Sequence, residues 1–152
     1  MIEFNKIFID TSIFIYYLED NERYCDKIIN LIEFCVLNNI SFVTSTIAYM
    51  EFCVKPYEMK KEEVIKKFQE LLIDFDIKVY GINIQVADIA AKLRSKYKGI
   101  KAMDALQIST AIYSSSNKFI TNDRKLKSID EIDVMLIDDM YKVIHLDEYN
   151  SK

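Results

Sequence analysis

The 152-residue chain is poor in the residues that interrupt secondary structure, since it contains two glycines and one proline. No glycine-rich, proline-rich or serine-rich tract marks a linker, and no internal repeat is visible. The length suits one well-packed hydrophobic core. These features predict a single domain that spans residues 1–152.

Cysteine and histidine are also scarce, which excludes several kinds of site. Cys25, Cys35 and Cys53 are odd in number and widely spaced, so they form no CxxC unit and no disulfide framework. We interpret them as buried structural thiols. His145 is the only histidine, which leaves no zinc site built on paired histidines and no histidine-dependent nucleophilic triad unless His145 alone serves it.

Long hydrophobic runs are absent as well. No apolar stretch approaches the ~20 residues that a membrane-spanning helix needs. The first residues, MIEFNKIFID, carry Glu3 and only a few consecutive apolar side chains, which is not the pattern of a signal peptide. We therefore expect a cytoplasmic protein that does not enter a membrane.

Charge is unevenly distributed along the chain. The whole sequence has a net charge of −4 and a pI of about 5.1, which does not suggest a nucleic-acid-binding protein. Residues 92–127, however, contain nine basic and two acidic residues, a net charge of +7. This basic segment suits a polyanion, although a lysine-rich solvated helix face is the simpler alternative.

Apolar runs and helical periodicity alternate along the chain. Short apolar runs that read as strands occur at residues 6–10, 40–45, 77–82, 118–121 and 133–138. Segments with helical spacing of apolar residues lie between them. This alternation predicts a three-layer α/β/α fold around a central five-stranded parallel sheet. Residues 141–152 form a tail to which we assign no role.

Asp10 lies in an unexpected place, because it follows the first apolar run and precedes another. Ligands of open parallel sheets bind beyond the carboxyl ends of the strands, which is where this carboxylate would lie. The alternative is that Asp10 or Thr11 only caps the following helix, with Ser12 as a further candidate N-cap.

Three more acids occupy similar positions. Glu51 lies in a short helix after the second strand, beside apolar residues on its own face. Asp104 begins a helix whose same face carries Ile108, and a favourable interaction with the helix dipole alone is worth only ~0.3–1 kcal/mol. Asp123 follows the fourth strand, where capping or an Asx turn is the better single explanation.

Together these acids predict a metal site. A parallel sheet can bring all four to one edge, where the carboxylates would repel one another unless a cation neutralised them. Mg²⁺ or Mn²⁺ prefers such oxygen ligands. A bound divalent ion lowers the pKa of water and stabilises charge on phosphoryl oxygens, so phosphodiester hydrolysis needs no histidine.

The motifs FIDTS, MDALQISTA and ITNDRKL, with Glu51 between the first two, resemble the PIN domain and, more narrowly, VapC-like toxin ribonucleases. The resemblance implies an endoribonuclease that cleaves single-stranded RNA with Mg²⁺ or Mn²⁺. It implies that Asp10, Glu51, Asp104 and Asp123 bind the metal and that Thr121 orders the pocket. It also implies a homodimer and an antitoxin partner that can block the pocket.

Five cations of the basic segment are candidate contacts to the RNA: Lys96, Lys98, Lys101, Arg124 and Lys125. Tyr97 could stack on a base, although packing is the better explanation. Three alternatives to a toxin remain: a PIN-fold nuclease of RNA processing, a non-catalytic module that binds RNA or protein, and a phosphoacceptor domain. The last normally needs an acidic pair after the first strand, which the sequence DTS does not provide.

Overall fold

The structure is a computed structural model that describes residues 3–150, with side chains described as far as residue 145. Its centre is a five-stranded sheet in which every neighbouring pair is parallel, in the order β3-β2-β1-β4-β5. The strands are β1 (Lys6–Ile9), β2 (Ser41–Ser45), β3 (Lys78–Tyr80), β4 (Lys118–Thr121) and β5 (Asp133–Leu136). The predicted five-stranded parallel sheet is therefore confirmed.

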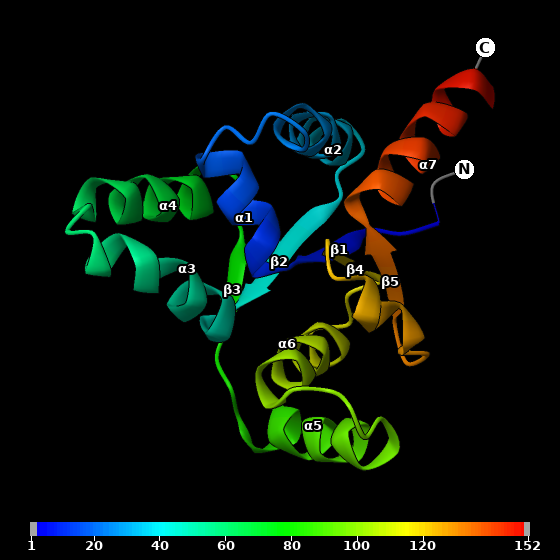
Figure 1. Cartoon of the computed structure of the whole chain (residues 1–152). Helices are drawn as coiled ribbons and strands as arrows, with labels where there is room; N and C mark the ends of the chain where they lie inside the picture. Colours follow the sequence, from blue (N-terminus) through cyan, green and yellow to red (C-terminus); the bar gives the residue numbers. More distant parts are fainter. Residues whose placement is uncertain (1–2, 151–152) are drawn as a thin grey trace.

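Helices cover both faces of this sheet (Figure 1). The helical elements are α1 (Thr11–Leu18), α2 (Cys25–Leu37), α3 (Thr46–Glu58), α4 (Glu62–Asp74), α5 (Ile84–Lys96), α6 (Ala102–Tyr113), the 3₁₀ helix η1 (Arg124–Ser128) and α7 (Ile137–Asn150). Helices α5 and α6 lie on one side of the sheet, and α1, α2 and α7 lie on the other. Among the described helices, none combines the length and apolarity needed to cross a bilayer.

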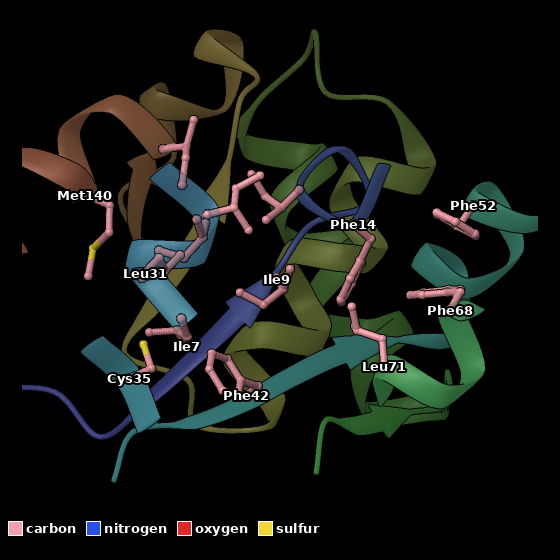
Figure 2. Packing of buried hydrophobic residues seen from close by; sticks show 14 of the residues in the cluster. Ile7, Ile9, Phe14, Leu31, Cys35, Phe42, Phe52, Phe68, Leu71 and Met140 are labelled. Atoms are coloured by element: carbon pink, nitrogen blue, oxygen red, sulfur yellow. The ribbon is translucent and has the colours of Figure 1, made fainter. Parts of the chain in front are cut away.

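Alternating strand residues separate the core into two halves. Successive side chains of a strand point to opposite faces, so Ile7 and Ile9 of β1 pack with α1 and α2, as Figure 2 shows. Phe8, between them, packs against Phe119 of β4 with ring centroids 5.0 Å apart on the α5–α6 side. Burial on both faces explains why the strands read as continuous apolar runs.

Because glycine is scarce, other residues occupy the left-handed position at the helix ends. Helices α1, α2, α3, α4 and α6 each end in a Schellman motif whose left-handed residue is not glycine. At the end of α3, for example, the Lys61 N–H donates to the Pro56 carbonyl at 2.8 Å. The residues with φ between 48° and 58° are Asp20, Asn39, Lys60, Asp76 and Ser115.

The C-terminal region differs from the sequence prediction. The strand predicted over residues 133–138 ends at Leu136, and α7 begins at Ile137. Ile137, Met140 and Ile144 recur at helical spacing and are buried in the core on the α2 side. Residues 141–150 of the tail thus belong to a helix that packs on α2, while residues 151–152 lie outside the described part.

The amino edge of the sheet is fastened by side chains that belong to no site. The Asn117 Oδ1 accepts hydrogen bonds from the backbone N–H groups of Asn5 and Lys6, each at 3.0 Å. The Lys6 Nζ donates to the Ser114 carbonyl at 2.8 Å. The start of β1 is therefore tied to the turn before β4.

Candidate acidic site

Asp10 follows β1 and caps α1. Its Oδ1 accepts a hydrogen bond from the Thr11 N–H at 2.7 Å, and its Oδ2 accepts one from the Thr121 Oγ1 at 2.6 Å. Asp10 is thus the N-cap, and the assignment of Ser12 to that role is wrong because α1 begins one residue before it, at Thr11. The Ser12 Oγ is buried and has no hydrogen-bond partner among the described residues.

Burial and neighbouring negative charges both disfavour the ionised form of Asp10. Burial raises its pKa from 3.8 to about 6, against the hydrogen bonds from Thr121 and Thr11, which lower it. The negative charges of Glu51 and Asp104 raise the pKa further. Two of the other predicted acids therefore lie close enough to Asp10 to affect its ionisation.

Glu51, on α3, is held by two donors. Its Oε1 accepts a hydrogen bond from the Gln107 Nε2 at 2.6 Å and one from the Thr11 Oγ1 at 3.1 Å. Sequence reasoning singled out neither Gln107 nor this function of Thr11. A signal did exist, because Gln107 is a long polar residue in a helix that is apolar over most of its circumference.

Asp104 lies in the first turn of α6. Burial raises the pKa of its carboxyl group, as does the negative charge of Asp123, while Lys101 and Lys125 lower it. Asp104 and Asp123 both line a cleft of about 430 Å³ between the segment before α6 and η1. The third and fourth predicted acids thus share one cavity.

Asp123 caps η1, since its Oδ1 accepts a hydrogen bond from the Lys125 N–H at 3.0 Å. Its own N–H donates to the Thr121 Oγ1 at 3.1 Å. The Thr121 hydroxyl therefore accepts from Asp123 and donates to Asp10. The capping function expected for Asp123 is present and leaves its carboxylate beside the cleft.

The four acids influence one another in pairs. Charge effects connect Glu51 to Asp10, Asp10 to Asp104, and Asp104 to Asp123. Within the described residues, however, no three histidine, cysteine, aspartate or glutamate side chains meet as a metal-binding group. The binding of one ion by all four acids therefore stays a prediction, and in the structure hydroxyl and amide donors hold oxygens of Asp10 and Glu51.

The available donors nevertheless suit a hard divalent cation. They are carboxylate oxygens with a threonine hydroxyl beside them, which is the ligand chemistry of Mg²⁺ and Mn²⁺. The raised pKa values of Asp10 and Asp104 mean that the ionised carboxylates are disfavoured, and a bound cation would stabilise the ionised form. The interpretation of the cysteines as buried thiols is right for Cys53 and for Cys35, whose pKa burial raises to about 12, and wrong for Cys25, which is only half-buried.

The basic segment contributes three of its five predicted cations to the cleft: Lys98, Lys101 and Lys125. Lys96 instead forms an ion pair with Glu131 at 2.8 Å, and Arg124 lies near Asp138, whose pKa it helps to lower. The cleft therefore combines two acids with three lysines. Such a combination can bind a phosphate backbone while presenting a carboxylate pair to it.

Tyr97 packs at the rim of this cleft. Its hydroxyl donates to the Glu131 Oε2 at 2.8 Å and accepts from the Asp130 N–H at 3.0 Å. These bonds connect the end of α5 to the loop before β5. Packing is therefore the better description of Tyr97, as expected.

His145 lies on α7, where its ring packs edge-on against Tyr141 with ring centroids 4.2 Å apart.

Fold and site together define an α/β/α protein in which acids and lysines line a cleft at the carboxyl edge of a parallel sheet. The chain belongs to the PIN domain family, whose sequence model matches residues 7–132. The resemblance read from the motifs is therefore confirmed at the level of the family. Among curated protein sequences, none matches this chain.

Several solved structures have a similar fold. VapBC2 from Rickettsia felis, bound to a promoter DNA fragment, has a TM-score of 0.72 at 21% identity and covers 86% of this chain and 98% of that one. VapBC-1 from nontypeable Haemophilus influenzae has a TM-score of 0.68 at 22% identity, and the match covers 88% of this chain and 98% of that one. A toxin-antitoxin complex from Klebsiella pneumoniae has a TM-score of 0.64 at 21% identity, and the match covers 86% of this chain and 97% of that one.

Proposed function

We propose that this chain is a single-domain, metal-dependent endoribonuclease that hydrolyses phosphodiester bonds in single-stranded RNA. The observation that carries the proposal is the placement of Asp104 and Asp123 in a cleft with three lysines, next to the buried Asp10. Acids alone would repel RNA, whereas lysines alone would bind it without cutting. The cleft offers both kinds of group within one cavity.

In this mechanism Asp10, Glu51, Asp104 and Asp123 would hold Mg²⁺ or Mn²⁺. When bound, such an ion activates water and stabilises negative charge on the phosphoryl group. Thr121 fixes the Asp10 carboxylate through its 2.6 Å hydrogen bond. Lys98, Lys101 and Lys125 would bind phosphates on either side of the scissile bond, and their charge would balance that of the strand.

The solved complexes support a proposal about an antitoxin partner. Because the structural neighbours include a toxin-antitoxin complex, we propose that this chain is the toxin of such a module and that an antitoxin can block it. We further propose that it acts in the cytoplasm and, as the resemblance to VapC-like toxins implies, as a homodimer. The adjacent open reading frame should then encode a small DNA-binding protein that co-purifies with this chain. If it does not, a PIN-fold enzyme of RNA processing becomes the better assignment.

The chemistry can be tested with labelled single-stranded RNA and Mn²⁺, with and without a chelator. Asp10→Asn and Asp104→Asn should each abolish cleavage, and the chelator should abolish it in the wild type. Asp88→Asn is the matched control, because Asp88 is an exposed acid on α5 whose ion pair in the described part of the chain is with Lys92. Equal cleavage by all four proteins would identify a contaminant, and RNA binding without cleavage under any divalent ion would favour a non-catalytic module.

A further inference from the structure

Gln107 connects three helices at the acidic site. Its side chain is buried, with 2% of its surface exposed. The Nε2 donates to the Glu51 Oε1 at 2.6 Å and to the Thr11 Oγ1 at 3.2 Å, and Thr11 itself donates to the same Glu51 oxygen at 3.1 Å. Gln107 on α6, Thr11 on α1 and Glu51 on α3 therefore form a closed triangle of hydrogen bonds.

This arrangement is not the one that stability alone would favour. The Gln107 Oε1 is buried and has no hydrogen-bond partner among the described residues, and a buried acceptor without a donor is unfavourable. Rotating the amide would place this oxygen against the Glu51 carboxylate, where two acceptors would face each other. A leucine would fill similar space with no polar atom to satisfy. The glutamine is thus explained by what it donates to Glu51.

We propose that Gln107 is a positioning residue for Glu51 and, through it, for the metal. The amide holds Oε1 of Glu51, so that Oε2 remains for a ligand bond. Residues three positions apart share a helix face, so α6 supplies Asp104 as a ligand and Gln107 as the support of another ligand. This inference rests on the proposed function, because it assumes that the acids bind a divalent ion.

The test measures Mn²⁺ binding by isothermal titration calorimetry on the full chain, without RNA. Gln107→Leu should weaken Mn²⁺ affinity by about 10- to 100-fold, the usual effect of losing a group that orients a metal ligand. The midpoint of thermal unfolding without metal should change little, because Thr11 still donates to Glu51 and the unsatisfied Gln107 Oε1 is removed. Ser109→Ala is the matched control, since Ser109 is buried in the same helix and its hydroxyl donates only to the Ala105 carbonyl in the described contacts.

The results separate this inference from the proposed function. Wild-type protein that binds no Mn²⁺ would overturn the proposed function. Wild-type binding with unchanged affinity in Gln107→Leu would overturn only the role of Gln107. A purely structural role would lower thermal stability and leave affinity intact. If Gln107→Leu does not fold, Thr11→Val removes the second donor to Glu51, and it should weaken Mn²⁺ binding in the same direction; unchanged affinity there would count against the triangle.

Discussion

The Thr121 hydroxyl donates a 2.6 Å hydrogen bond to the Asp10 carboxylate, although the two residues are 111 positions apart in the chain. The pairing of β1 with β4 makes this contact possible, because it places the ends of the two strands side by side. The same hydroxyl accepts a hydrogen bond from the Asp123 N–H. One oxygen atom therefore sets the positions of two acids relative to each other.

Thr121→Val should weaken metal binding. Loss of the hydroxyl removes a group that lowers the pKa of Asp10, so the pKa rises above about 6 and less carboxylate is ionised near neutrality. We expect Mn²⁺ affinity to fall about tenfold at pH 7, the effect of about 1.4 kcal/mol. Calorimetry from pH 6 to 8 measures it. Thr121→Ser should restore affinity, and Thr110→Val on α6 should leave it unchanged.

Asp10→Asn should stabilise the protein in metal-free buffer at pH 7.5. The folded-state pKa of about 6 lies above the ordinary 3.8, so between these values the folded state binds more protons than the unfolded state. The free energy of unfolding therefore falls as pH rises from about 4 to about 6, by about 3 kcal/mol at most. Urea denaturation of both proteins at pH 4 and 7.5 measures it; an equal stability difference at the two pH values would contradict the prediction.

Lysines that line the cleft should contribute to RNA binding, whereas paired lysines should not. In an Asp10→Asn background, which leaves RNA intact, Lys101→Ala and Lys125→Ala should each reduce the slope of log K against log salt by about 0.7. Lys96→Ala should change it less, because Lys96 is paired with Glu131. Filter binding at several salt concentrations tests this. Equal effects of all three substitutions would argue against the cleft as the path of the strand.

Tyr97→Phe should loosen the rim of the cleft. The substitution removes hydrogen bonds to Glu131 and to the Asp130 backbone while keeping the ring. We expect a loss of about 1–3 kcal/mol in the free energy of unfolding, measured by urea denaturation. Tyr113→Phe is the control, because the Tyr113 ring packs edge-on against Tyr80 away from this rim. Similar losses in both variants would mean that the hydroxyl of Tyr97 has no special function.

Lys60→Gly should raise stability. Lys60 follows α3 with φ of 54°, a left-handed conformation that costs most residues roughly 1–2 kcal/mol and glycine little. Since glycine also gains freedom in the unfolded chain, we expect a net increase of about 0.5–1 kcal/mol in the free energy of unfolding. Asp76→Gly should gain less, because aspartate tolerates this conformation better. A decrease for Lys60→Gly would contradict the assignment of strain to this position.

Much of the fold could be predicted because burial on both faces leaves a clear pattern. Strands such as Ile7–Ile9 are apolar without interruption, and turns and charged helix faces separate them. The sequence does not reveal the start of α7, because its first residue, Ile137, extends the apolar run of β5 before Asp138 and Asp139 appear. The recurrence of Ile137, Met140 and Ile144 was the usable signal.

The site was predictable as a set of residue types and not as a set of contacts. Asp10, Asp104 and Asp123 are conspicuous acids beside apolar segments. The bond between Gln107 and Glu51 joins residues 56 positions apart, and no local pattern encodes which donor a carboxylate finds. The partner of Lys96 could not be predicted for the same reason, since Glu131 lies 35 positions away in the chain and holds Lys96 outside the cleft.

The contacts of Asn117 with the start of β1 have a practical consequence. This end of the sheet lies opposite the end where the acids gather, and it is held by its own hydrogen bonds. A fluorophore or a surface anchor attached near Asn5 should therefore leave the binding of RNA and metal unobstructed.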